Sequence, residues 1–180
     1  MKITETGLDG LYLIEPSVYK DKRGYFFEAW NHETFLKHGL DMEFLQDNQS
    51  LSSTNVLRGL HFQVPPFEQG KLVRVISGSV LDVVVDLRKS QPTFGKHFKC
   101  VLDTHKKNML WIPPGFAHGF LTLESNTVFF YKCSQVYSKD YDRVILWNDP
   151  ELDIDWGIND PIVSEKDKNA PGFSQFASPF

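Results

Sequence analysis

The sequence is poor in cysteine and has no block of basic residues. Its two cysteines, Cys100 and Cys133, do not form a CxxC pair, so we expect two buried, reduced thiols and a cytoplasmic location. The 180 residues carry a formal net charge of −4 without a run of Lys or Arg. This composition gives no electrostatic support for binding nucleic acid or a membrane surface, although a few well-placed cations would suffice for a small anionic ligand.

Long apolar stretches are missing as well. No segment approaches the roughly 20 apolar residues needed to span a bilayer, and no apolar region of a signal peptide follows Met1–Glu5. The chain also lacks internal repeats, low-complexity tracts and linkers. We therefore expect a soluble, unsecreted chain that forms one domain over residues 1–180 and is long enough to bury a sizeable core.

Aromatic residues, in contrast, are abundant: they make up 14% of the chain, and 15 of them are Phe. Such a supply is typical of the inside of a β-barrel or sandwich, and some rings could stack on a flat ligand. Within Ser79–Leu87, Leu or Val at positions 81, 83, 85 and 87 share one face, while Asp82 and Asp86 share the other, which predicts a half-buried strand. The preceding Ser77-Gly78-Ser79 turn predicts a hairpin between Lys71–Ile76 and Val80–Leu87.

Short segments with strand character recur along the whole chain, separated by turns with Gly and Pro. Besides the two just named, they are Ile3–Thr6, Tyr12–Glu15, Phe44–Ser50, Val56–Phe62, His97–Leu102, Asn108–Ile112, Ala117–Leu123 and Thr127–Val136. Only Asn31–His38 is predicted to be helical inside the body, capped by Asn31 or its neighbour and ended by Gly39. A short helical turn is expected after Ser164. The pattern predicts an all-β sandwich or barrel with one or two short helices.

A concentration of polar residues occurs in Arg58-Gly59-Leu60-His61-Phe62-Gln63. In a strand, His61 and Gln63 point to one face, and Arg58 faces the other unless Gly59 marks a bulge. A lone His in a strand is usually a core or surface residue. A hairpin that brings Lys71 beside Arg58 and His61 changes this interpretation, because the three together indicate an anion site that contains a base.

A second histidine follows a rigid turn in Pro113-Pro114-Gly115-Phe116-Ala117-His118-Gly119, which is either a β-turn with a surface His or a turn that delivers His118 into a barrel. The two segments resemble the halves of the cupin motif, in which histidines and a Glu hold a divalent transition metal. Here Gln63 takes the place of the second His. The pattern favours a cupin that has kept the barrel and lost the metal. A metal-binding cupin built on His61, His118 and Glu68, either a dioxygenase or a sugar-binding module, is the alternative.

Eight short motifs occur in order along nearly the whole chain: Arg23–Glu28, Gln46–Ser50, Leu57–Gln63, Gln69–Arg74, Pro114–Phe120, Tyr131–Cys133, Trp147–Pro150 and Ser164–Asp167. One such motif would be weak, but eight in this order closely resemble the dTDP-4-dehydrorhamnose 3,5-epimerase family. The resemblance implies a cupin-type jelly-roll barrel of antiparallel strands. It also implies an isomerase that needs neither a metal nor another cofactor.

The resemblance assigns catalytic roles to four residues. His61 matches the base that removes a proton beside the C4 ketone, and an imidazole with an ordinary pKa of about 6.5 suits this task near pH 7. Tyr131 matches the acid that returns a proton on the opposite face. Lys71 matches the cation that stabilises the enolate oxygen, and Asp167 the carboxylate that holds the base in its useful tautomer.

The resemblance also implies substrate contacts and a partner. Arg23 and Arg58 match diphosphate ligands, and Tyr137 matches an aromatic that stacks on thymine, with Phe26 nearby. Further polar contacts to the substrate are expected from Glu28, Gln46, Asn48, His118, Asp142 and Lys166. Family members exchange N-terminal strands between two subunits, so a homodimer is expected in which Arg23 and Glu28, on a β-hairpin, reach the neighbour's site.

The expected reaction is the epimerisation of dTDP-4-dehydro-6-deoxy-D-glucose at C3 and C5 to dTDP-4-dehydro-L-rhamnose, in the biosynthesis of dTDP-L-rhamnose. A single-centre 3- or 5-epimerase, or a ketoisomerase, that acts on another dTDP-4-keto-deoxysugar is the alternative with the same fold. The motifs do not separate these reactions.

Overall fold

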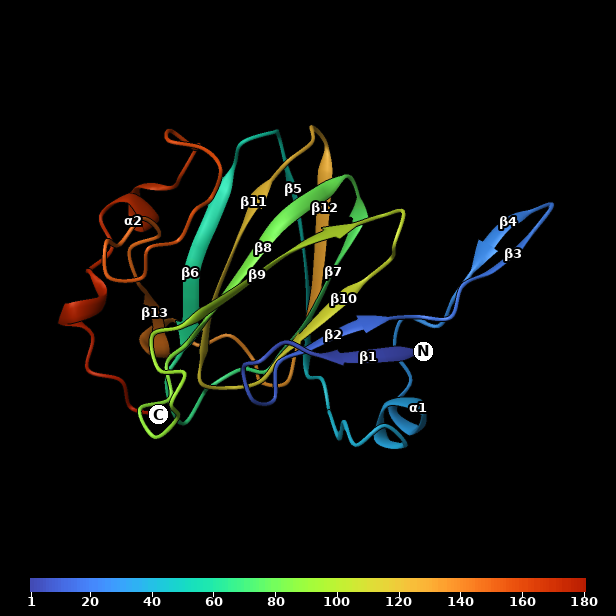
Figure 1. Ribbon diagram of the computed structural model, residues 1–180, viewed down its shortest axis with the longest axis horizontal. Coiled ribbons are helices and arrows are strands. Elements are labelled where there is room, and N and C mark those ends of the chain that lie inside the picture. Colours follow the sequence, from blue (N-terminus) through green and yellow to red (C-terminus); the bar gives the residue numbers. More distant parts are fainter.

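Two antiparallel sheets face each other in the computed structural model, which describes residues 1–180 (Figure 1). The six-stranded sheet has the order β1 (Lys2–Glu5), β2 (Tyr12–Glu15), β10 (Met109–Ile112), β7 (Lys71–Ser77), β12 (Thr127–Cys133) and β5 (Gln46–Ser52). The five-stranded sheet has the order β13 (Asp142–Val144), β6 (Leu57–Gln63), β11 (Phe116–Thr122), β8 (Ser79–Asp86) and β9 (His97–Asp103). Neighbouring strands often lie far apart in sequence, as in a jelly roll. The predicted all-β class is confirmed.

Large apolar side chains fill the space between the two sheets. Val73 and Phe129 from the six-stranded sheet meet Val84 and Phe120 from the five-stranded sheet. A second cluster lies on the outer face of the five-stranded sheet, where the C-terminal segment (orange to red in Figure 1) packs through side chains such as Trp156. Burying a side chain of this size contributes about 1.5–3 kcal/mol. Many of the aromatic side chains are therefore part of the hydrophobic core or pack against it, as predicted.

Helices are few and short: α1 (His32–Leu36), α2 (Glu165–Lys168) and the 3-10 helices η1 (Lys139–Tyr141) and η2 (Phe173–Gln175). As predicted, Asn31 caps α1 by accepting a hydrogen bond from the Thr34 N–H (3.1 Å), and the chain turns away at Gly39, where φ is +80°. The Ser164 hydroxyl caps α2 by accepting from the Asp167 N–H. None of the helices combines the length and apolar character that crossing a membrane requires.

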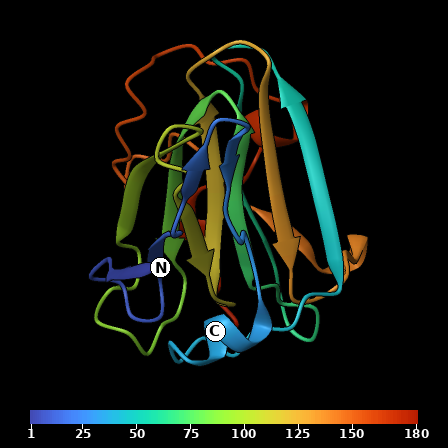
Figure 2. The same cartoon turned by 90° about the vertical axis from the view of Figure 1, so that its right-hand side faces the viewer.

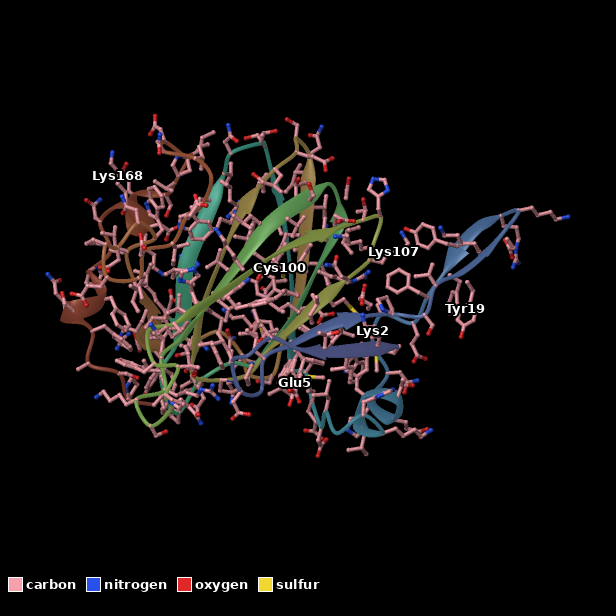
Figure 3. The ribbon with its side chains drawn as sticks, in the orientation of Figure 1. Lys2, Glu5, Tyr19, Cys100, Lys107 and Lys168 are labelled. Carbon is pink, nitrogen blue, oxygen red and sulfur yellow. The ribbon has the colours of Figure 1, made fainter.

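A small hairpin stands apart from both sheets. It consists of β3 (Tyr19–Asp21) and β4 (Gly24–Phe26), which pair only with each other, and we call it the N-terminal arm. The arm projects beyond the barrel in Figure 1 and lies in front of it when the molecule is turned by 90° in Figure 2. Tyr19 extends from it into open space, and the Phe26 side chain is 70% exposed (Figure 3).

The predicted hairpin between β7 and β8 is wrong. β7 pairs with β10 and β12, whereas β8 pairs with β9 and β11. Gly78, with φ at +81°, makes the predicted turn, but this turn carries the chain from one sheet to the other. A Cβ at Gly78 would lie 2.3 Å from the Thr127 hydroxyl, so this corner has room only for glycine.

The prediction that the β8 strand is half-buried is also wrong. Asp82 and Asp86 have no exposed surface, because the five-stranded sheet is covered on one face by the facing sheet and on the other by the C-terminal segment. Asp86 is neutralised by a bidentate ion pair with Arg88 (2.8 and 2.9 Å). The alternation in the sequence therefore separates two buried faces, and the carboxylates require partners inside the protein.

Candidate active site

A histidine–carboxylate pair joins the five-stranded sheet to the C-terminal segment. His61 Nε2, on β6, lies 2.6 Å from Asp167 Oδ1, on α2. Burial tends to raise the pKa of Asp167, but the His61 ring, the Gly59 N–H and the Ser164 cap hold it below its ordinary value. A charged carboxylate only accepts hydrogen bonds, so Nε2 carries a proton, and in the neutral ring Nδ1 then has the free lone pair. This arrangement is suited to a general base.

A bulge turns Arg58 and His61 toward the same cavity. The pairing of β6 with β11 shifts between His118, opposite His61, and Phe120, opposite Arg58. Gly59 sits in this shift with φ at +149°, and a Cβ there would lie 2.5 Å from the Cα of Gly119. The structure therefore contains the Gly59 bulge, which the sequence alone did not decide.

The cavity holds about 280 Å³ and is mostly polar. Its lining comes from both sheets and comprises Asn48, Gln49, Ser50, Arg58, His61, Lys71, His118, Phe120 and Tyr131. Lys71 does meet Arg58 and His61, as predicted, but the cause differs from the prediction. β6 and β7 belong to different sheets, so the three side chains meet across the barrel and not within a hairpin.

Lys71 and Tyr131 lie on the six-stranded sheet, across the cavity from His61. Burial lowers the pKa of the Lys71 ammonium, and the nearby carboxyl groups of Asp142 and Asp82 oppose this. Burial raises the pKa of the Tyr131 phenol. A neutral phenol is a proton donor, and a cation beside it favours negative charge on a bound substrate.

A second histidine–carboxylate pair lies deeper in the barrel. His118 Nε2 is 2.9 Å from Asp82 Oδ2, both side chains are buried, and Asp82 Oδ1 has no hydrogen-bond partner. Burial raises the pKa of Asp82, although His118 and Lys71 oppose this. Asp82 is a site residue that was not predicted from the sequence. An Asp in an otherwise apolar strand was the available signal, but it was interpreted as a solvent-facing residue.

Most of the remaining predicted contacts form a hydrogen-bonded group that reaches the cavity through Asn48, and we call this group the rim. Gln46 donates to Asn48 Oδ1 (3.0 Å) and accepts from the Tyr137 N–H (2.7 Å). The Tyr137 hydroxyl donates to Asp142 (3.2 Å), which also pairs with the Lys166 ammonium. These residues come from β5, β13, α2 and the segment after β12, so four separate parts of the chain converge here.

The three predicted residues of the N-terminal region are not brought to the cavity. Arg23, at the tip of the arm, donates to Asp21 (2.6 and 3.0 Å) and is largely exposed. Phe26 ends β4, and Glu28, beyond the hairpin, accepts from Asn31 and Thr34 (3.0 Å each). The arm projects on the opposite side of the molecule from β6, β13 and α2 (Figure 1).

The structure brings no three His, Cys, Asp or Glu side chains into a group that could hold a metal ion. His61 and His118 are opposite each other in the β6–β11 pairing, but each ring bonds its own aspartate. Glu68 does not line the cavity.

Comparisons with known proteins agree with one another. The family model described as dTDP-4-dehydrorhamnose 3,5-epimerase matches residues 5–175. An enzyme of that name from Shigella flexneri is 46% identical over 174 residues, which cover 96% of each chain. The crystal structure of a protein of that name from Elizabethkingia anophelis superposes with a TM-score of 0.92, at 46% identity over 97% of both chains. A dTDP-6-deoxy-D-glucose-3,5-epimerase from Legionella pneumophila, solved with dTDP-4-keto-L-rhamnose, has a TM-score of 0.93 and 40% identity, covering 98% of this chain and 94% of that one.

Proposed function

Because the chain belongs to the dTDP-4-dehydrorhamnose 3,5-epimerase family, we propose that its cavity epimerises dTDP-4-dehydro-6-deoxy-D-glucose at C3 and C5 to dTDP-4-dehydro-L-rhamnose. The chain is an isomerase of this type and a jelly roll of the cupin type. One observation carries the proposal: His61 and Tyr131 line the same cavity from facing sheets. A sugar ring between them has a base on one face and an acid on the other.

The chemistry follows from this placement. His61 Nδ1 takes a proton from the carbon beside the C4 ketone. The C–H electron pair forms a C=C bond to C4, and the C=O π pair moves onto the oxygen, which gives an enolate. The Lys71 ammonium stabilises the charge on the enolate oxygen. Tyr131 then gives its phenolic proton to the same carbon from the other face, which inverts that centre. His61 then releases the abstracted proton to solvent, and the Tyr131 phenolate takes up a proton from solvent, before the second centre reacts.

The rim supports recognition of a nucleotide. Arg58 lines the cavity, and its assignment to the diphosphate is supported by the match between a guanidinium fork and phosphate oxygens. Tyr137 stacks on the thymine, and Gln46, Asn48, His118, Asp142 and Lys166 supply polar contacts to nucleotide and sugar. The free thiols of Cys100 and Cys133 support a cytoplasmic location, which fractionation of the source cells would test.

Deuterium incorporation tests the reaction. The protein is incubated with dTDP-4-dehydro-6-deoxy-D-glucose in deuterated water, and C3 and C5 are followed by NMR. Deuterium and inversion at both carbons are expected. Incorporation at one carbon alone would replace the proposal with a single-centre epimerase, and incorporation at neither would reject the substrate.

We further propose that the protein is a homodimer in which the N-terminal arm completes the partner's site. Arg23 and Phe26 are exposed on a hairpin that leaves its own barrel, and their predicted role requires a nucleotide beside them. An apolar depression of about 340 Å³ next to the arm, which includes Phe26, Leu72 and Phe130, is a surface that a second chain would cover. Light scattering is expected to give twice the mass of the chain. A monomeric mass with full activity would reject this assembly.

A further inference from the structure

Gln63 ends β6, two residues after His61, and both polar atoms of its side-chain amide form hydrogen bonds. Its side chain is 4% exposed. Nε2 donates to the Phe67 carbonyl (2.6 Å) and to the Val136 carbonyl (3.1 Å), while Oε1 accepts from the Ser138 N–H (2.6 Å). One buried amide thus ties the segment between β6 and β7 to the segment that follows β12.

Two of these three bonds, to Val136 and to Ser138, flank Tyr137. Val136 and Ser138 are its neighbours in the chain, and the Tyr137 N–H itself donates to Gln46 (2.7 Å). The Tyr137 side chain is 54% exposed, so packing against the protein does not fix its ring. The position of the ring comes from the backbone on either side and from the hydroxyl bond to Asp142.

We propose that Gln63 is a positioning residue for nucleotide binding: it fixes the Val136–Ser138 backbone so that the Tyr137 ring is in place before a thymidine nucleotide arrives. The inference rests on the proposed function, in which Tyr137 stacks on thymine. Ordering a loop in advance lowers the entropic cost of binding. The proposed role also explains why Gln63 stands where the cupin motif has a His. A neutral imidazole has one donor and one acceptor and cannot make these three bonds.

Affinity for dTDP, measured by titration calorimetry, tests the inference. Gln63→Met keeps the volume and removes all three bonds, and we expect dTDP to bind about tenfold more weakly because the loop must order on binding. The KM of the sugar substrate should rise in parallel, while kcat stays within about twofold. Unchanged dTDP affinity would overturn the inference, as would a fall in kcat at unchanged affinity.

Asn108 offers a matched control. It is also 4% exposed and also bonds two backbone groups, the Val101 carbonyl (2.8 Å) and the Asp103 N–H (3.1 Å), at the turn between β9 and β10. Asn108→Leu removes a buried amide of the same kind away from the Tyr137 segment, and its dTDP affinity should equal that of the wild type. A loss equal to that of Gln63→Met would attribute the effect to general destabilisation and reject the inference.

A double-mutant cycle separates this inference from the proposed function. Tyr137→Ala alone should weaken dTDP binding, and adding Gln63→Met to it should have no further effect. Additive losses would show that Gln63 does not act through Tyr137. A wild type that does not bind dTDP would reject the proposed function itself. If Gln63→Met does not fold, Gln63→Glu replaces it: its carboxylate still accepts from Ser138 but loses both donors, and an affinity equal to the wild type's would reject the inference.

Discussion

Arg58 and Arg23 are both guanidinium groups for which we propose the same ligand, a diphosphate, yet their surroundings differ in kind. Arg58 lies on β6, beside the Gly59 bulge, and it lines the cavity and donates to the Ser52 hydroxyl (3.2 Å). Arg23 lies at the tip of the N-terminal arm and bonds only Asp21, two residues away. The strand register of the five-stranded sheet positions Arg58, whereas no residue of the same barrel positions Arg23.

This contrast suggests that the proposed proton transfers depend on the cavity of one chain, whereas part of the substrate binding depends on the N-terminal arm. The proposed base, acid and cation, His61, Tyr131 and Lys71, all lie on strands of one chain and line one cavity, so the proposed reaction centre lies within a single barrel. The arm residues contact little of their own barrel, and in the proposed dimer they lie against the partner's cavity. We therefore expect substitutions in the cavity to act on kcat and substitutions in the arm to act on KM.

The largest effect is expected from His61→Asn. Without the base, kcat should fall about 10²–10⁴-fold, while dTDP affinity and the melting temperature change little. The assay is the initial rate at saturating substrate. His105→Asn, at an exposed histidine on the turn after β9, is the control, and an equal loss there would contradict a specific role for His61.

Tyr131→Phe tests whether acid and base act from facing sheets. The phenyl ring preserves the packing but has no proton to give, so inversion should slow by about 10²-fold or more. His61 is still present, so hydrogen exchange between substrate and solvent should persist without inversion. NMR in deuterated water distinguishes the two events, and inversion at the wild-type rate would remove Tyr131 from the reaction.

The pH dependence of kcat/KM should report Lys71. Its ammonium must be charged for activity, so activity falls as the pH rises through the pKa of Lys71. Because burial lowers this pKa, the fall should begin at a lower pH than an ordinary lysine would give. The Tyr131 phenol, whose pKa is raised, should lose its proton only at higher pH. In Lys71→Arg the guanidinium stays charged, so the residual activity should persist to higher pH. If Lys71→Arg loses activity at the same alkaline pH as the wild type, another group is responsible for the loss. Lys106→Arg, at an exposed site, is the control and should leave the pH profile unchanged.

A smaller effect is expected from Arg23→Ala. Loss of a charge-assisted bond to phosphate should raise KM about tenfold and leave kcat within about twofold. Lys20→Ala removes a positive charge from the same hairpin without touching a proposed contact, and its KM should stay unchanged. Equal KM values in Arg23→Ala and the wild type would remove the arm from the site.

Local signals in the sequence predicted local structure well. Ten strands, the Asn31 cap and the Ser164 turn depend on near neighbours and were predicted, whereas the Gly59 bulge was left open. The partners of each strand depend on which sheet it joins, and a turn such as Gly78 carries no such information. The same limit hid Asp82, since its partner His118 is 36 residues away, and it hid β13, whose short Asp142–Val144 segment is a strand only because β6 lies beside it.

Subunit complementation tests the central claim most directly. A His61→Asn chain and a chain with Arg23, Phe26 and Glu28 changed to Ala are each expected to be nearly inactive at low substrate concentration. If the arm serves the partner's cavity, mixed dimers contain one site in which both the cavity and the arm are unaltered. Random pairing then restores about one quarter of the wild-type activity. Mixtures that stay as inactive as their components would show that each arm serves its own barrel and would contradict the account.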